Sequence, residues 1–152
     1  MKNFKNQKGF TLIELLVVIG ILAVLLAITL IAINPAKQFS QANNTKRRSD
    51  VNAILNAVDQ YMADNKGALP AGVTTTAQQI SSTGANICTD LVPTYIAALP
   101  VDPQTGTGAA ITQAGCATEY VTGYTIVKSA ANNRITVTAT TIELGDQISV
   151  TR

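Results

Sequence analysis

From Lys8 to Ile33 the chain reads KGFTLIELLVVIGILAVLLAITLIAI, and this stretch decides how the rest of the molecule is organised. Its apolar run begins at Phe10 and spans 24 residues, which as a helix is roughly 36 Å long. That length is sufficient to cross a bilayer. Three lysines within residues 1–8 precede the run, so the positive-inside rule predicts residues 1–9 in the cytoplasm and the rest of the chain outside it.

A cleaved secretory signal peptide is the weaker interpretation of this segment. Signal peptides have a shorter apolar core that ends at an A-x-A-like site. Here the run continues to Ile33 and is followed by Asn34-Pro35. We therefore expect residues 10–33 to stay in the mature protein as a membrane helix.

Composition excludes several classes of function. The 152 residues include no histidine, so imidazole bases, histidine metal ligands and Ser-His-Asp chemistry are excluded, and no glycine-rich phosphate loop is present. Without the three leader lysines, the eleven basic residues become eight against nine acidic ones, a net charge of −1. We expect no enzyme, no cofactor, no metal site and no nucleic-acid partner.

The apolar run contains one charged residue, Glu14. A lone carboxylate in hydrocarbon costs a few kcal/mol, so a membrane helix is expected to pair it or to use it. The alternative is that Glu14 lies at the headgroup level and simply reaches water.

The string KGFTLIE, residues 8–14, resembles the type IV prepilin signature. That family comprises type IV pilins and the pseudopilins of type II secretion. In it, a membrane-embedded aspartyl peptidase cuts after the glycine and methylates the new amino terminus, which implies cleavage between Gly9 and Phe10. The resemblance also implies a filament of pilin-like subunits, built by an assembly ATPase acting through a membrane platform protein.

Cleavage would place a cationic α-amino group on Phe10. A sister copy shifted along the helix axis could then offer its amine to Glu14. At about 4 Å, with an effective dielectric near 20, such a pair is attracted by roughly 4 kcal/mol. We therefore expect Glu14 to set the register of packed helices during subunit assembly.

Beyond the membrane segment, the sequence predicts that residues 34–66 form the second, amphipathic half of the long helix. Pro35 predicts a bend, after which the helix resumes and ends near Lys66, before Gly67. Continuous from Phe10 to Lys66, it would be roughly 85 Å long. An apolar stripe along this helix should pack on a head domain, and it comprises Val51, Ile54, Leu55, Val58, Tyr61 and Met62. Polar residues, Asp50 among them, are expected on the other faces of the helix.

A basic cluster, residues 46–48, falls within this helix. Its cations could pair with acids of adjacent subunits, but a solvated helical face is the favoured interpretation.

Residues 67–120 form a loop-rich region in which we expect one or two short elements. Residues 89–100 read as a short helix ended by Pro100, and Asp102 as a turn residue. The Asp102 carboxylate could also be an oxygen ligand of Ca²⁺, as in the calcium site of major pseudopilins. The tryptophan and the acidic loop expected of that subfamily are absent from this sequence.

Residues 121–152 alternate with period two, which predicts a three-stranded antiparallel meander. Its apolar face should pack against the helix stripe and comprises Tyr124, Ile126, Ile135, Val137, Ile148 and Val150. The predicted fold class is therefore α+β, a long amino-terminal helix with a small antiparallel sheet, which is also the fold that the resemblance implies.

The two cysteines, Cys88 and Cys116, both lie outside the predicted membrane segment. An even count in an oxidising compartment predicts a disulfide, with two reduced buried thiols as the alternative.

These observations favour a structural subunit of a type IV pilus, located in the cytoplasmic membrane before assembly and in a surface pilus or periplasmic filament afterwards. A pseudopilin of type II secretion is the alternative within the family, and a membrane-anchored binding module is the alternative outside it. A DNA-uptake receptor would need a basic strip, for which Lys128, Arg134 and Arg152 are too few.

Overall fold

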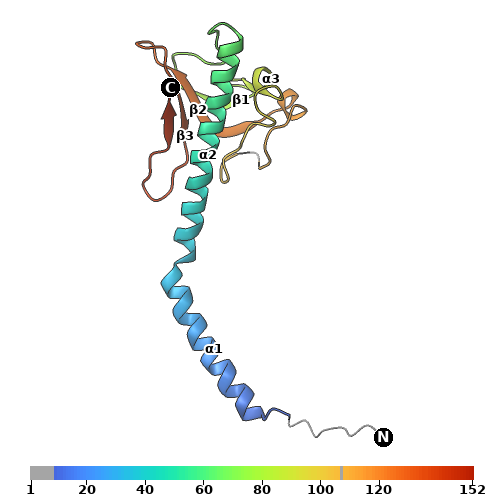
Figure 1. Cartoon of the computed structure of the whole chain (residues 1–152), viewed down its shortest axis with the longest axis vertical. Helices are drawn as coiled ribbons and strands as arrows, with labels where there is room; N and C mark the ends of the chain where they lie inside the picture. The colour runs from blue at the N-terminus through green and yellow to red at the C-terminus, as the bar shows by residue number, and fades with distance from the viewer. Residues whose placement is uncertain (1–8, 107) are drawn as a thin grey trace, which may run out of the picture. The chain divides into compact units, whose positions relative to one another are not determined.

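The computed structural model describes residues 9–106 and 108–152. The leader lysines therefore lie outside the described residues. Two compact units divide the chain between Gln38 and Phe39. The first contains an apolar helix, and the second contains a helix packed on a sheet (Figure 1).

Helix α1, Leu12–Ile33, is the helical part of the apolar run. Its 22 residues have a mean hydropathy of 3.2, and every one of its side chains is exposed. Among the described residues it is the one helix long and apolar enough to cross a membrane. Its aliphatic side chains form no core within this chain, so they remain available for lipid or for another protein.

Asn34 interrupts the helical path between α1 and α2, Pro35–Asp64. Asn34 has a left-handed backbone, with φ 46° and ψ 78°, because a residue before proline is disfavoured in the right-handed helical region and asparagine tolerates the left-handed one. Its Oδ1 accepts from the Lys37 N–H at 3.3 Å, and Pro35 opens α2 without needing a hydrogen-bond acceptor. The prediction that the helix resumes is confirmed, and Asn34 divides it into two helices.

The sheet has strand order β1-β2-β3-β4, all antiparallel: Gln78–Ser81, Val121–Lys128, Ile135–Ala139 and Ser149–Thr151. The predicted meander is confirmed as β2, β3 and β4. Strand β1 was missed, because a four-residue strand with two adjacent buried residues does not show a period of two. Its place in the sheet is decided by pairing with β2, where Gln79 lies opposite Thr125.

The predicted helix at residues 89–100 is largely wrong. Helix α3 spans only Cys88–Leu91. Val92 is extended, with φ −99° and ψ 132°, because the following Pro93 disfavours the helical conformation at the residue before it.

The core lies between α2 and the sheet (Figure 1). The predicted stripe of α2 and the predicted sheet face both contribute to it: Val51, Ile54, Leu55, Val58, Tyr124, Ile126, Ile135, Val137 and Ile148 are buried, and Tyr61, Met62 and Val150 pack against them. Both predictions are confirmed, because the helical and strand periods each place one row of side chains on one face.

Strand β2 contains a glycine where Asp102 lies against it. Gly123 has φ +83°, and a Cβ there would come within 2.6 Å of Asp102 Cβ. The Asp102 N–H donates to the Thr122 carbonyl oxygen at 2.8 Å. This close approach places the Asp102 carboxylate next to the sheet and under α2.

Candidate functional site

The first turn of α1 is closed by a reciprocal capping box. Thr11 is the N-cap, and the Glu14 N–H donates to its Oγ1 at 3.3 Å. In return, Glu14 Oε2 accepts from the Thr11 N–H and from the Thr11 hydroxyl, each at 2.7 Å. The carboxylate therefore has two local donors before any partner is considered.

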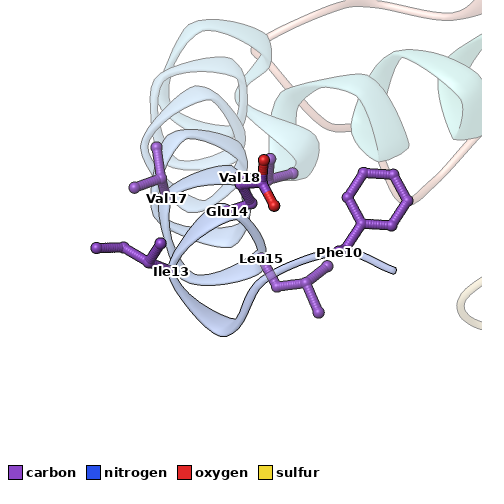
Figure 2. A pocket seen from close by; sticks show the side chains of 6 residues that line it. All are labelled: Phe10, Ile13, Glu14, Leu15, Val17 and Val18. Atoms are coloured by element: carbon purple, nitrogen blue, oxygen red, sulfur yellow. The ribbon is translucent and has the colours of Figure 1, made fainter. Parts of the chain in front are cut away.

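Apolar side chains surround Glu14. A shallow surface hollow at this end of α1 is lined, besides Glu14, by Phe10, Ile13, Leu15, Val17 and Val18 (Figure 2). Glu14 is thus the only charged group in an otherwise apolar lining. Such a surface suits a partner that brings both apolar area and a single cation.

Gly9 and Phe10 precede the helix and are both exposed. Among the described residues, no atom other than those of Gly9 and its chain neighbours lies within 4 Å of the position that a Cβ on Gly9 would take. The peptide bond predicted to be cut is therefore accessible and outside regular structure, while residues 1–8 lie outside the described residues.

Sequence reasoning singled out Glu14 as the one charged residue of the apolar run but missed the capping role of Thr11. The signal was present, because Thr-x-x-Glu ahead of an apolar run is a capping-box pattern. By donating two hydrogen bonds to Glu14 Oε2, Thr11 satisfies part of the hydrogen-bonding capacity of the carboxylate within the subunit and holds the carboxylate in a fixed orientation.

A second polar cluster lies on α2, where Arg47 is fully buried. Its Nε donates to Asp102 Oδ2 at 2.6 Å and its Nη2 to Asp102 Oδ1 at 3.3 Å. The remaining N–H groups of the guanidinium donate to Asn44 Oδ1, Glu143 Oε2 and Gln104 Oε1 at 2.8–2.9 Å. All five donors of the guanidinium are therefore satisfied.

The prediction of a solvated basic face at residues 46–48 is wrong for Arg47 for this reason, whereas Lys46 and Arg48 are exposed. Arg47 is buried, and Lys46 donates to Asp50 Oδ2 at 2.7 Å. Asp50, expected on a polar face, is buried and also accepts from the Tyr124 hydroxyl at 2.7 Å. The cluster joins α2 to the loops and to β2 of the same chain, because its acids come from residues distant in sequence.

Asp102 is a turn residue as predicted, and it is also the main counter-ion of Arg47. Its Oδ1 accepts from the N–H groups of Gln104 at 2.8 Å and Thr105 at 3.0 Å. Burial alone would raise the pKa of the Asp102 carboxyl, but Arg47 and these two N–H donors together hold the pKa below its usual value. Among residues 9–106 and 108–152, no group of three His, Cys, Asp or Glu side chains is arranged to hold a metal ion.

The turn Glu143–Asp146 is fixed to α2 by polar side chains. Five residues of α2 at three- and four-residue spacing contact it: Ser40, Asn43, Asn44, Arg47 and Arg48. Hydrogen bonds from Arg47, Asn43 and Ser40 hold the pKa of the Glu143 carboxyl below its usual value, against the smaller effect of burial. One face of α2 is thus polar in its first half, where it positions a loop, and apolar in its second half, where it packs on the sheet.

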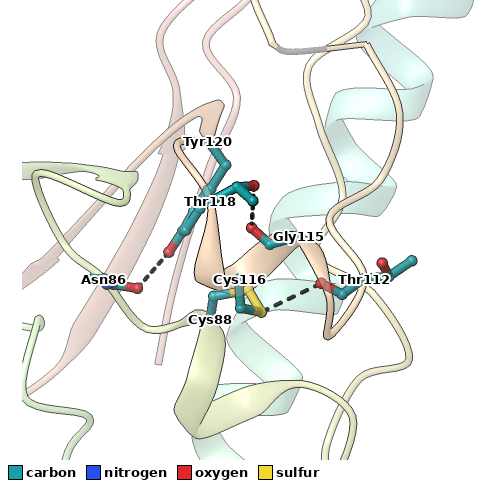
Figure 3. The surroundings of a disulfide bond; sticks show 7 residues. All are labelled: Asn86, Cys88, Thr112, Gly115, Cys116, Thr118 and Tyr120. Atoms are coloured by element: carbon teal, nitrogen blue, oxygen red, sulfur yellow. Dashed lines mark hydrogen bonds between the residues drawn. A yellow bond between two sulfur atoms is a disulfide. The ribbon is translucent and has the colours of Figure 1, made fainter.

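Cys88 and Cys116 form a disulfide (Figure 3). Their Cα atoms lie 5.4 Å apart, and the bond joins α3 to the 3₁₀ turn Gly115–Ala117. Cys116 Sγ lies 3.5 Å from the Thr112 carbonyl oxygen. Because a disulfide sulfur carries no hydrogen, this approach is a van der Waals contact. Beside the bond, the Tyr120 hydroxyl donates to Asn86 Oδ1 at 2.8 Å.

Comparison with known proteins points to the same end of the chain. The family model described as the prokaryotic N-terminal methylation motif matches residues 4–30. The chain is 33% identical over 88 residues to the type IV wide pilus major component PilA4 of Thermus thermophilus. The matched segment covers 58% of this chain and 66% of that protein.

The type II secretion system core protein G is also similar. The Escherichia coli protein is 40% identical over 65 residues, 43% of each chain. The Pseudomonas aeruginosa protein is 41% identical over 61 residues, 40% of this chain and 42% of that protein. No solved structure gives a significant match.

The chain spans less than two thirds of the length of these relatives. The chain also matches the methylation motif over residues 4–30 and has the apolar helix α1, with Glu14 in the first turn of that helix. The chain is therefore homologous to the type IV pilin PilA4 and to the type II secretion pseudopilin core protein G.

Proposed function

We propose that the chain is a structural subunit of a type IV pilus. The observation that carries this proposal is α1: an apolar helix of 22 residues, every side chain of which is exposed, with one carboxylate at its start. Such a surface is satisfied first by lipid and then by like helices, because a helix bundle and a lipid environment are similarly apolar.

In this proposal a prepilin peptidase cuts between Gly9 and Phe10 and methylates the Phe10 amine. The exposure of both residues ahead of α1 is consistent with access by a protease. Before assembly the leader lies in the cytoplasm, α1 spans the cytoplasmic membrane and the second unit lies outside. A platform protein and an ATPase then move the subunit into the filament, and the chain itself has no catalytic role.

Glu14 takes the amine of an adjacent copy during assembly. Thr11 occupies Oε2 of the carboxylate, and this leaves Oε1 for the cation. The pairing supplies register, because apolar contacts alone discriminate poorly between neighbouring positions along a helix.

The decisive measurement is mass spectrometry of the mature amino terminus, combined with electron microscopy of surface filaments labelled for this protein. We expect N-methyl-phenylalanine at Phe10 and labelled fibres. An intact Met1 on protein that still forms fibres would contradict the proposal, and an intact Met1 without fibres would favour a membrane-anchored binding module.

Glu14→Ala tests the role of the carboxylate, with Glu14→Asp as the variant that keeps the charge. We expect Glu14→Ala to insert into the membrane and to be cleaved normally, but to give few filaments. Normal filament yield from Glu14→Ala would remove the assembly role of this residue.

A pseudopilin of type II secretion is the second candidate, because the core protein G relatives have the higher identities, over shorter segments. Loss of protein secretion on deletion, in cells without long fibres of this protein, would favour that function. Long labelled surface fibres would favour the pilus.

A further inference from the structure

The turn Glu143–Asp146 presents an apolar side chain to solvent in a conformation that leucine rarely adopts. Leu144 has φ +60° and Gly145 φ +73°, and the Asp146 N–H donates to the Glu143 carbonyl oxygen at 3.3 Å. Both central residues of such a turn need positive φ, which favours Asn, Asp and Gly. Leucine is unfavourable here, yet it is 52% exposed.

The anchors of the turn prevent Leu144 from turning inward. Glu143 and Asp146, on either side of the two central residues, are both held by hydrogen bonds from α2. Strained residues persist where the surrounding structure determines them, and they cluster at functional sites.

Leu144 forms the apolar wall of a surface groove between the turn and α2. The other lining residues are Gln41, Asn44, Thr45, Arg48 and Asp146. Arg48 and Asp146 pair with each other at 2.6 Å, so the charged groups of the groove are already neutralised. Five of the six lining residues are polar and Leu144 is the apolar one, so the groove suits an uncharged occupant that makes its apolar contact with Leu144.

A second unexplained apolar group lies on the same helix. Phe39 is 70% exposed. At about 100° per residue, Phe39 lies roughly 180–240° around α2 from Gln41, Thr45 and Arg48. Phe39 of one chain therefore faces away from the groove of that same chain.

We propose that the Leu144 groove receives Phe39 of a second copy of this chain. This inference rests on the proposed function, in which copies pack side by side through α1, and it identifies a contact beyond α1. Phe39 and the groove residues of α2 lie within about three turns of one another on the same helix, so two copies aligned side by side along α2 would place Phe39 of one copy level with the groove of the other. Because the two surfaces differ, the contact is heterologous, and such contacts propagate into open filaments.

Leu144→Asn and Phe39→Ser test the contact in the full-length chain. Asparagine tolerates positive φ, so Leu144→Asn should fold and unfold at a temperature equal to or above that of the wild type. We expect both variants to lower the sedimentable filament yield at least tenfold. Leu144→Met keeps the apolar group and should assemble, and so should Ile142→Asn, which removes a 43% exposed residue that does not line the groove.

Cross-linking gives a direct measurement. Phe39→Cys combined with Leu144→Cys should give a ladder of covalent multimers with a short bismaleimide, and each single variant should not. Wild-type filament yield from Leu144→Asn and Phe39→Ser, without a ladder from the double variant, would overturn the contact. Absence of filaments from the wild type would instead overturn the proposed function.

Discussion

Arg47 depends on its partners because both it and Asp102 are fully buried. A buried ion pair adds little net stability when both partners are present, but removing one leaves the other charged and uncompensated. With all five N–H groups satisfied, the guanidinium links α2 to the Asp102 loop and to the Glu143 turn. The geometry fits arginine and would not be reproduced by lysine.

We predict that Arg47→Met lowers the free energy of unfolding by about 3–5 kcal/mol, because Asp102 loses its counter-ion while staying buried. Urea unfolding followed by circular dichroism measures this change. The control is Arg48→Gln, which breaks a half-exposed pair with Asp146 and should cost less than about 1 kcal/mol. Equal effects from the two variants would contradict the special role of Arg47.

Acid should destabilise the second unit through Asp102 and Glu143. The folded state lowers the pKa of both carboxyls, so their contribution is fully present above the unfolded pKa values of about 3.9 and 4.3. It is lost as pH falls below those values and through the folded pKa of each group. The free energy of unfolding measured between neutral pH and about pH 2 should fall, and the fall should be shallower in Glu143→Gln. Parallel curves for the two proteins would contradict this assignment.

At the scale of elements, α2 combines two kinds of contact along one helix. Its first half contacts loops through polar side chains, and its second half packs on the sheet through the stripe from Val51 to Val58. The helix ends with Lys66 at φ 55° and the Gly67 N–H donating to the Met62 carbonyl oxygen at 2.8 Å, a left-handed C-terminal cap.

The disulfide stabilises a region with little regular structure. It joins residues separated by 28 positions, and the chain-entropy model gives roughly 3–4 kcal/mol for such a loop. We predict that Cys88→Ala combined with Cys116→Ala lowers the free energy of unfolding by about this amount. Wild-type protein unfolded in the presence of a reductant is the matched control. An unchanged urea midpoint in both samples would contradict the prediction.

At the scale of the whole molecule, the two units differ in where their apolar side chains lie. The second unit buries its apolar side chains in one core, whereas α1 exposes all of its own. A chain of this kind needs an apolar environment for α1 at every stage.

We therefore predict that the full-length protein stays in the membrane pellet after alkaline carbonate extraction and is released by detergent. Immunoblotting of the two fractions checks this. Glu14→Leu should behave in the same way, because retention depends on the apolar length of α1 rather than on its carboxylate. Release of the wild type by carbonate alone would show that α1 does not span the bilayer.

Local pattern was sufficient to predict the main elements of the fold. The apolar run predicted α1, and apolar residues three and four positions apart predicted the stripe of α2. Alternation of apolar and polar residues predicted β2, β3 and β4. Strand β1 escaped because four residues with adjacent buried positions show no period. The predicted helix at 89–100 failed because Pro93 ends it after Leu91.

The sequence by itself determined the apolar helix, the position of Glu14 within it, the amino-terminal methylation motif and the α+β class, because each depends on residues close together in the chain. Only the tertiary structure decided that Arg47 is buried, that Glu143 lies beside it and that Leu144 is held outward. These facts depend on residues about 55 to 100 positions apart meeting in space. The free energy of a charge depends on its neighbours and its burial, and no local pattern encodes either of them.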